Sequence, residues 1–273
     1  MIQGLSPYNY DFAVAAIPLQ VLLMVFHGFR RNLPVRRNSY FLAIMVSNLI
    51  MTVFDIVSCE MNEVWQTFPL WLMYLVNILY FAPLIIRGLA LLAYTADVSR
   101  FPKLLQHHIR ADKMIRVLLS LPSVITLALI LSSPWTGAVF TFGPNGYANN
   151  YAVYPIIYFT TYFNIIVSIL IVLICLRLNP VHITLSALGY NLILLLGIIF
   201  RRMFFHVLVT SYISVLTILV IYLSSQNPDF YRDRITRLFN RSAFEQIYLD
   251  MKLKGLPCFY VLINVHNLET ARR

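Results

Sequence analysis

The chain has 273 residues, of which 59% are hydrophobic and only 12% are charged, and its formal net charge is +10. Such a chain has too few polar side chains to coat a water-soluble globule of this length, so its composition excludes an ordinary soluble protein. The mean hydropathy of +0.73 agrees with an integral membrane protein.

Apolar segments long enough to cross a bilayer recur along the chain. A bilayer core of about 30 Å takes roughly 20 helical residues. By this measure the sequence predicts an all-α polytopic bundle with seven spans: Asp11–Phe29, Ser39–Ser58, Phe68–Tyr94, Met114–Ser133, Tyr151–Leu176, His182–Phe200 and Phe204–Ser225. Only Arg201-Arg202 separates the last two spans, and we expect a tight reversal there because the combined run is too long for one crossing.

Basic residues indicate which loops face the cytoplasm. They gather between spans one and two, three and four, and five and six: Arg30, Arg31, Arg36, Arg37, Arg100, Lys103, Arg110, Lys113, Arg116 and Arg177. The alternate loops carry Glu60 and Glu63 or almost no charge. The sequence therefore predicts an outside N-terminus and a cytoplasmic C-terminus, with Arg201-Arg202 as the exception. No cleavable signal peptide is expected, because no Lys or Arg precedes the first apolar segment.

Polar side chains inside the predicted spans are candidates for function, because an uncompensated charge in hydrocarbon costs at least a few kcal/mol. Asp55 lies toward the outer end of its span, where it either lines a pocket or bonds to a neighbouring helix. Arg87 lies deeper toward the inner side, so we do not pair it with Asp55 and expect it to extend to the inner interface. We expect hydrogen bonds between helices from four mid-membrane asparagines: Asn48, Asn77, Asn164 and Asn191.

Arg201, Arg202 and His206 form a basic cluster on the predicted outer side. Such a cluster either recognises an extracellular carboxylate or phosphate through bidentate hydrogen bonds or anchors the chain to lipid headgroups, and both interpretations stay open. A series of tyrosines follows the outer loop and the fifth span, where interfacial aromatics are expected: Tyr147, Tyr151, Tyr154, Tyr158 and Tyr162. Cys59 has no outer partner cysteine, so no disulfide framework is indicated.

The residues after the last span have a different character. Pro228 marks the exit from that span, because proline cannot continue a helix. Asn240 is a candidate N-cap for a helix over residues 241–254, with an apolar face of Ala243, Ile247 and Met251. The apolar run over residues 258–265 predicts a buried strand. The expected organisation is a membrane module (1–225), a linker with a start motif (226–240) and an incomplete α/β fragment with one helix and one strand (241–273).

The start motif carries a resemblance to a known family. The residues Asp233, Ile235, Thr236, Leu238, Asn240 and Arg241, followed by a helix and an apolar strand, resemble the opening Asp-x-Leu-Thr-Gly-Leu-x-Asn-Arg of the GGDEF domain, the diguanylate cyclase fold. The resemblance covers residues 233–273. It implies a bacterial membrane sensor whose cytoplasmic domain, when complete, converts GTP to cyclic di-GMP with the help of Mg²⁺.

The chain also departs from that family. Asn264 stands where the resemblance implies the aspartate that binds Mg²⁺, and phosphodiester formation needs that metal to neutralise developing charge. His266 replaces the second aspartate, Arg237 replaces the motif glycine, and Arg272 falls where guanine recognition is expected. The GGDEF signature does not occur up to Arg273. We therefore expect no catalysis and no cofactor in this chain, which is either a fragment or a degenerate relative.

The expected function is that of a membrane signalling protein that senses an external or bilayer signal and passes a helix shift to the tail. Two other classes stay open: a small-molecule transporter or channel, and the sensor module of another signalling protein such as a histidine kinase. The expected partners are the lipid bilayer, an extracellular small molecule and a second copy of the chain. GTP is expected only for a completed domain, and nucleic acid is not expected, because the positive charge is explained by topology.

Overall fold

The computed structural model describes residues 8–29, 35–104, 109–144, 146–204, 206–225, 233, 235–236, 238–254, 259 and 261. This described part is mostly helical (81%) and has a small two-stranded sheet. The chain divides into two compact units: Met1–Asn32 with Arg37–Asn227, and Leu33–Arg36 with Pro228–Arg273.

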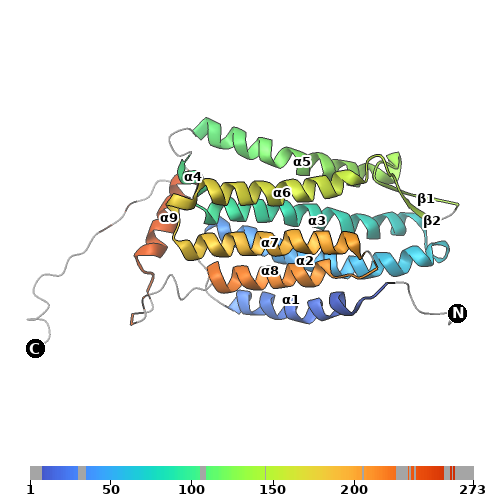
Figure 1. Ribbon diagram of the computed structural model, residues 1–273, viewed down its shortest axis with the longest axis horizontal. Helices are drawn as coiled ribbons and strands as arrows, with labels where there is room; N and C mark the ends of the chain where they lie inside the picture. The colour runs from blue at the N-terminus through green and yellow to red at the C-terminus, as the bar shows by residue number, and fades with distance from the viewer. Residues whose placement is uncertain are drawn as a thin grey trace, which may run out of the picture. The chain divides into compact units, whose positions relative to one another are not determined.

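Long helices follow one another along most of the chain (Figure 1). In chain order they are α1 (Asp11–Phe29), α2 (Arg36–Glu63), α3 (Leu70–Val98), α4 (Phe101–Leu104), α5 (Ile109–Thr136), α6 (Pro155–Ile174), α7 (Val181–Met203), α8 (Thr210–Ser225) and α9 (Arg241–Lys254), with 3₁₀ turns at Trp65–Thr67 and Leu176–Leu178. Within the described residues, six helices are long and apolar enough to cross a membrane: α1, α2, α3, residues Met114–Thr136 of α5, α6 and α7. The protein is therefore a multi-pass membrane protein.

The seventh predicted span is shorter than the sequence analysis expected. The helix α8 has 16 residues, a length of about 24 Å, which is less than the bilayer core of about 30 Å. Residues 201 and 202 belong to the last turn of α7, so the reversal lies between Met203, where α7 ends, and Thr210, where α8 begins, instead of at Arg201. The backbone N–H of Asn9 donates to His206 O at 2.8 Å and Leu208 N–H donates to Asn9 O at 3.1 Å, so the segment before α1 pairs with this reversal.

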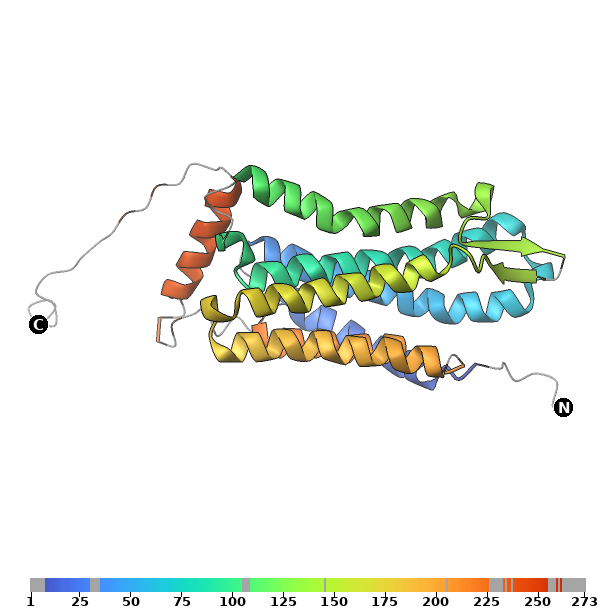
Figure 2. The ribbon, with the colours of Figure 1, turned by 45° about the horizontal axis from the view of Figure 1, so that its top comes forward.

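The helices α7 and α8 lie side by side, and α1 packs on α8 (Figures 1 and 2). Gly197 of α7 permits this close approach, because a Cβ atom at this position would lie 2.6 Å from Cγ2 of Ile213 on α8. Small residues at such contacts matter in lipid, where van der Waals packing replaces the hydrophobic effect as the force between helices.

A buried hydrogen-bond network connects α1, α2, α3 and α8. Arg87 is 4% exposed, and its Nη1 donates to Asn48 Oδ1 at 2.7 Å and to Ser214 Oγ at 2.5 Å. Asn48 Nδ2 donates in turn to Gln20 Oε1 at 2.6 Å. The prediction that Arg87 extends to the inner interface is wrong, because the bundle interior supplies the acceptors that its guanidinium needs.

The mid-membrane asparagines behave mostly as the sequence predicts. Asn48 bonds between α1 and α2, as above, and Asn77 of α3 exchanges hydrogen bonds with Asn62 of α2 at 3.1 and 3.3 Å. Asn164 of α6 does the same with Ser123 of α5 at 3.1 and 3.4 Å. The prediction is wrong for Asn191, which donates to Ala187 O of its own helix at 2.8 Å. Bonds between helices are therefore confirmed at three of the four positions.

A β-hairpin between α5 and α6 was not expected from the sequence. Its strands β1 (Phe140–Gly143) and β2 (Gly146–Asn149) are antiparallel, and they lie at the same end of the bundle as the α2–α3 connection (Figure 2). Gly146 has φ of +93°, and a Cβ there would lie 2.8 Å from Nε1 of Trp65 in that connection. Glycine is thus required both by the backbone conformation and by the closeness of the indole.

The second unit contains α9, whose bounds are those predicted. Asn240 Oδ1 accepts from Ala243 N–H at 3.1 Å, which confirms it as the N-cap. Ala243 packs with Val35 and Ile247. Most of the predicted strand at 258–265 and the positions Arg237, Asn264, His266 and Arg272 lie outside the described residues. Phe259 and Val261, which are described, lie in no strand and are 98% and 85% exposed.

We predict opposite effects from alanine at two glycines of α7. Gly189→Ala should be neutral or stabilising by about 0.5–1 kcal/mol, since open space surrounds that position and alanine favours helix. Gly197→Ala should destabilise by about 1–3 kcal/mol, because the new methyl group meets Ile213. Thermal unfolding of the detergent-solubilised protein measures both effects. A Gly197→Ala protein as stable as the Gly189→Ala protein would contradict the close α7–α8 packing.

Candidate functional site: a cavity at the hairpin end of the bundle

A cavity of about 670 Å³ lies at the end of the bundle that carries the hairpin. Residues of α2, α3, α6 and α7 form its wall, together with the hairpin, Tyr8 and Thr210 at the start of α8. This volume falls within the range of small-molecule sites in proteins. The cavity is therefore the candidate binding site.

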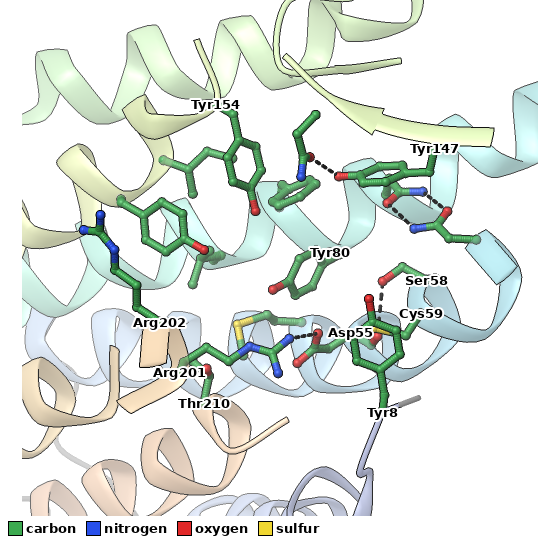
Figure 3. A pocket seen from close by; sticks show the side chains of 18 of the residues that line it. Tyr8, Asp55, Ser58, Cys59, Tyr80, Tyr147, Tyr154, Arg201, Arg202 and Thr210 are labelled. Carbon is green, nitrogen blue, oxygen red and sulfur yellow. Dashed lines mark hydrogen bonds and ion pairs between the residues drawn. The ribbon is translucent and has the colours of Figure 1, made fainter. Parts of the chain in front are cut away.

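An ion pair between α2 and α7 lies in the wall (Figure 3). Arg201 Nη2 is 3.8 Å from Asp55 Oδ1, and the two side chains are 17% and 2% exposed. Asp55 Oδ2 is buried without a hydrogen-bond partner in the described part of the chain. The Tyr80 side chain also interacts with Asp55. Burying a carboxylate is costly, and such groups in membrane helices are often functional. The structure thus brings together two residues that the sequence analysis had kept in separate candidate sites.

Arg201 also contacts the reversal between α7 and α8. Its Nη1 donates to the backbone oxygen of Val207 at 2.6 Å. One guanidinium therefore connects a carboxylate in the cavity wall with the segment that leads into α8.

Arg202 and His206 have different places. Arg202 is exposed and lines the cavity, and within the described residues it forms neither a hydrogen bond nor an ion pair. Its guanidinium points away from the Asp55–Arg201 pair (Figure 3). His206 is exposed and not part of the lining, and its ring centroid lies 6.1 Å from that of Tyr8. Of the predicted basic cluster, the cavity contains the two arginines.

Tyrosines contribute much of the remaining lining. The cavity is bordered by five phenols: Tyr8, Tyr80, Tyr147, Tyr154 and Tyr158. The Tyr147 hydroxyl donates to Asn149 Oδ1 at 2.6 Å. Burial raises the pKa of Tyr147 well above its usual value and also raises the pKa of Tyr8, so both hydroxyls stay protonated as donors.

The sequence analysis assigned three of these tyrosines to the membrane interface. Only Tyr151 of the loop fits that assignment well, at 89% exposed. Tyr154 and Tyr158 are four residues apart, a spacing that places them on one face of α6, and this was the available signal. Tyr80 and Tyr8 had no such signal, because their position beside the Asp55–Arg201 pair depends on how the helices pack (Figure 3).

The chemistry of this lining is that of binding. Within the described residues, no group of three His, Cys, Asp or Glu side chains could hold a metal ion. The wall offers guanidinium and phenol donors together with apolar surface from residues such as Phe81 and Ile157. Such a mixture of a few polar groups with aromatic rings is typical of a pocket that orients a small organic molecule.

The start motif in the tail forms a compact turn. Asp233 Oδ1 accepts from Thr236 N–H at 2.8 Å, from Ile235 N–H at 3.0 Å and from Thr236 Oγ1 at 3.0 Å. Asp233 N–H donates to Leu238 O at 2.9 Å, which leads the chain toward the Asn240 cap. Arg241 follows with an exposed contact to Glu245 Oε1 at 3.2 Å. The hydrogen bonds, chiefly from the Thr236 backbone, lower the pKa of Asp233.

Comparison with known proteins does not assign a family: no protein-family model, no curated protein and no solved structure matches the chain. The resemblance to the GGDEF domain therefore remains a prediction from the motif residues.

We predict that Asp55 and Arg201 are energetically coupled. Asp55→Asn or Arg201→Gln alone should destabilise the protein by about 3 kcal/mol, because each leaves a buried charge without its partner. The double variant should lose at least about 1 kcal/mol less than the sum of the single losses. Unfolding in detergent micelles measures the cycle, with Glu60→Gln, an exposed acid on the same helix, as the control. Additive losses would mean that the 3.8 Å contact carries no interaction energy.

The Asp233 turn should depend on pH in a defined direction. Its folded pKa is lowered, so the turn is fully stabilised above the ordinary aspartate value of about 3.9 and is lost as the pH falls through the lower folded value. The NMR shift of the Thr236 amide should therefore titrate with a midpoint below about 3.9, and Asp233→Asn should abolish the titration. A midpoint at or above the ordinary value would show that these hydrogen bonds do not form in solution.

Proposed function

We propose that the protein is a membrane receptor that binds a small molecule in the cavity and transmits a change through α8 to the tail. The observation that carries this proposal is the double role of Arg201. It pairs with Asp55 in the cavity wall at 3.8 Å and holds Val207 O in the α7–α8 reversal at 2.6 Å. Thr210, the first residue of α8, lines the same cavity. A ligand that draws on Arg201 would thus act on the beginning of the helix that leads to the tail.

The proposed topology has seven crossings, with α8 as the seventh, the N-terminus outside and the C-terminus in the cytoplasm. The support comes from the basic loops of the sequence and from the packing of α8 against α7 and α1. The shortness of α8 is compatible with a crossing, because a short span is accommodated by local thinning of the bilayer. In this orientation the cavity faces the exterior.

The proposed output segment resembles the beginning of a GGDEF domain. Its support is the motif from Asp233 to Arg241, the turn that Asp233 forms and the capped helix that follows. Mg²⁺ and GTP belong to this proposal only for a completed domain. With Asn264 at the metal position, turnover is not expected even then, because asparagine supplies no negative charge.

The proposed signal is a small displacement of α8. Two arginines take part in the polar contacts of this helix and the reversal before it: Arg201 reaches the reversal, and Arg87 donates to Ser214 at 2.5 Å in the second turn of α8. A ligand that weakens the Arg201 contact would remove one of the bonds of the reversal, where Asn9 also pairs, while the Arg87 contact holds α8 at Ser214. Helix translations of about 1–2 Å are a common means of transmission in receptors.

We predict that Arg201→Gln, which removes the charge that holds the reversal, alters hydrogen exchange along α8 and in the tail residues 238–254. The protein is reconstituted in lipid nanodiscs and followed by exchange mass spectrometry. Arg177→Gln, an exposed arginine between α6 and α7, is the matched control and should leave α8 and the tail unchanged.

Two results would reject the receptor proposal. The first is altered exchange confined to residues 201–209, with α8 and the tail as in the wild type, because the contact would then be local. The second is uptake of a radiolabelled solute by protein-containing vesicles above protein-free vesicles, together with an unchanged tail, which would support the transport alternative.

A further inference from the structure

We propose that the cavity binds an organic anion, with its carboxylate or phosphate group on Arg202 and its apolar body against the tyrosine rings. This inference rests on the proposed function in that it names the ligand class of the same cavity. It goes beyond that function because it follows from the charges in the wall and not from the tail.

With Asp55 covered, the accessible charges of the described wall are two arginines and one glutamate, an excess of one positive charge. Four charged residues line the cavity: Asp55, Glu63, Arg201 and Arg202. Asp55 is the covered partner of its pair, with a side chain 2% exposed against 17% for Arg201, so a molecule in the cavity meets the guanidinium and not the carboxylate. Arg202 adds a second cation that no described residue neutralises. Glu63 lies in the last turn of α2, where it is exposed.

The side chain of Arg202 is placed to bind a charged group of a ligand. Its fork of N–H donors borders the cavity without a bond to a described acceptor, and a guanidinium binds carboxylate or phosphate through paired, charge-assisted hydrogen bonds. The phenols of Tyr80, Tyr154 and Tyr158 border the same space, although Tyr80 also interacts with Asp55 and Tyr154 with Tyr158. An ammonium ligand would find one exposed carboxylate, that of Glu63, among the described lining residues.

The body of the ligand follows from the rest of the lining. Aromatic and aliphatic side chains contribute apolar surface, among them Trp65, Phe81 and Ile157. The volume of about 670 Å³ admits a molecule much larger than an inorganic ion. Two sources share this chemistry: a soluble carboxylate or phosphate ester from outside, and the headgroup of an anionic lipid.

The test uses the full chain in phosphatidylcholine nanodiscs and four probes of similar size: benzoate, phenyl phosphate, benzyl alcohol and benzylamine. We expect the two anions to raise the midpoint of thermal unfolding more than the alcohol or the amine at equal concentration. Arg202→Gln should weaken benzoate binding about tenfold, as expected for loss of a charge-assisted hydrogen bond, while the response to benzyl alcohol stays. Arg177→Gln is the control for net charge, since this arginine lies outside the cavity lining.

A second arm replaces phosphatidylcholine by phosphatidylglycerol, without probes. Phosphatidylglycerol could raise the midpoint of thermal unfolding in the wild type and in Arg177→Gln but not in Arg202→Gln, while soluble anions have no effect. This result would support the proposal with a lipid headgroup as the source of the anion. The proposal is overturned if benzylamine or benzyl alcohol matches benzoate, or if neither soluble anions nor anionic lipid gives an effect that depends on Arg202. These binding measurements do not depend on the tail. If an anion binds but leaves hydrogen exchange in the tail unchanged, the receptor proposal is rejected and the anion-binding proposal stands.

Discussion

The hydrogen bonds of Arg87 are the constraint on which the bundle depends. In hydrocarbon a guanidinium must find acceptors within the protein, because neither water nor lipid chains supply them. Asn48 of α2 and Ser214 of α8 meet this requirement at 2.7 and 2.5 Å, and Gln20 of α1 continues the chain of bonds. These directional contacts fix the depth at which the helices meet, which apolar packing alone specifies less strictly.

The need of buried charged groups for hydrogen-bond partners is met less completely at the cavity. There the Asp55–Arg201 pair is incompletely satisfied, with a separation of 3.8 Å and a carboxylate oxygen that has no hydrogen-bond partner among the described residues. A fully bonded network gives a rigid contact, whereas an incompletely bonded one is easily rearranged by a new donor or acceptor. Arg87 thus gives α8 a firm contact at Ser214, and Arg201 gives the reversal before α8 a responsive contact at Val207. This division is the physical basis of the receptor proposal.

The hairpin forms part of the cavity wall, and its position depends on a single glycine. Gly146 has a positive φ and leaves room for the Trp65 indole, so β2 lies directly on the α2–α3 connection. Tyr147, the next residue, thereby reaches the cavity together with Asn149. An irregular loop of similar length would not hold these side chains in fixed positions, because strand pairing sets which residues face the bundle.

By itself the sequence determined the membrane class, six of its seven predicted spans approximately, the asparagine contacts at Asn48, Asn77 and Asn164, and the capped helix α9. Hydropathy, span length and capping are local properties, which a sequence pattern records. It did not reveal the hairpin, although Gly143-Pro-Asn-Gly146 is a turn signal, or the role of Tyr154 and Tyr158 in the cavity. Only the tertiary structure decided that Arg87 bonds within the bundle and that Asp55 meets Arg201. Those contacts join helices far apart in the chain, and they form only at a particular depth and rotation of each helix. Side-chain packing between the helices sets this depth and rotation, so no local sequence pattern predicts them.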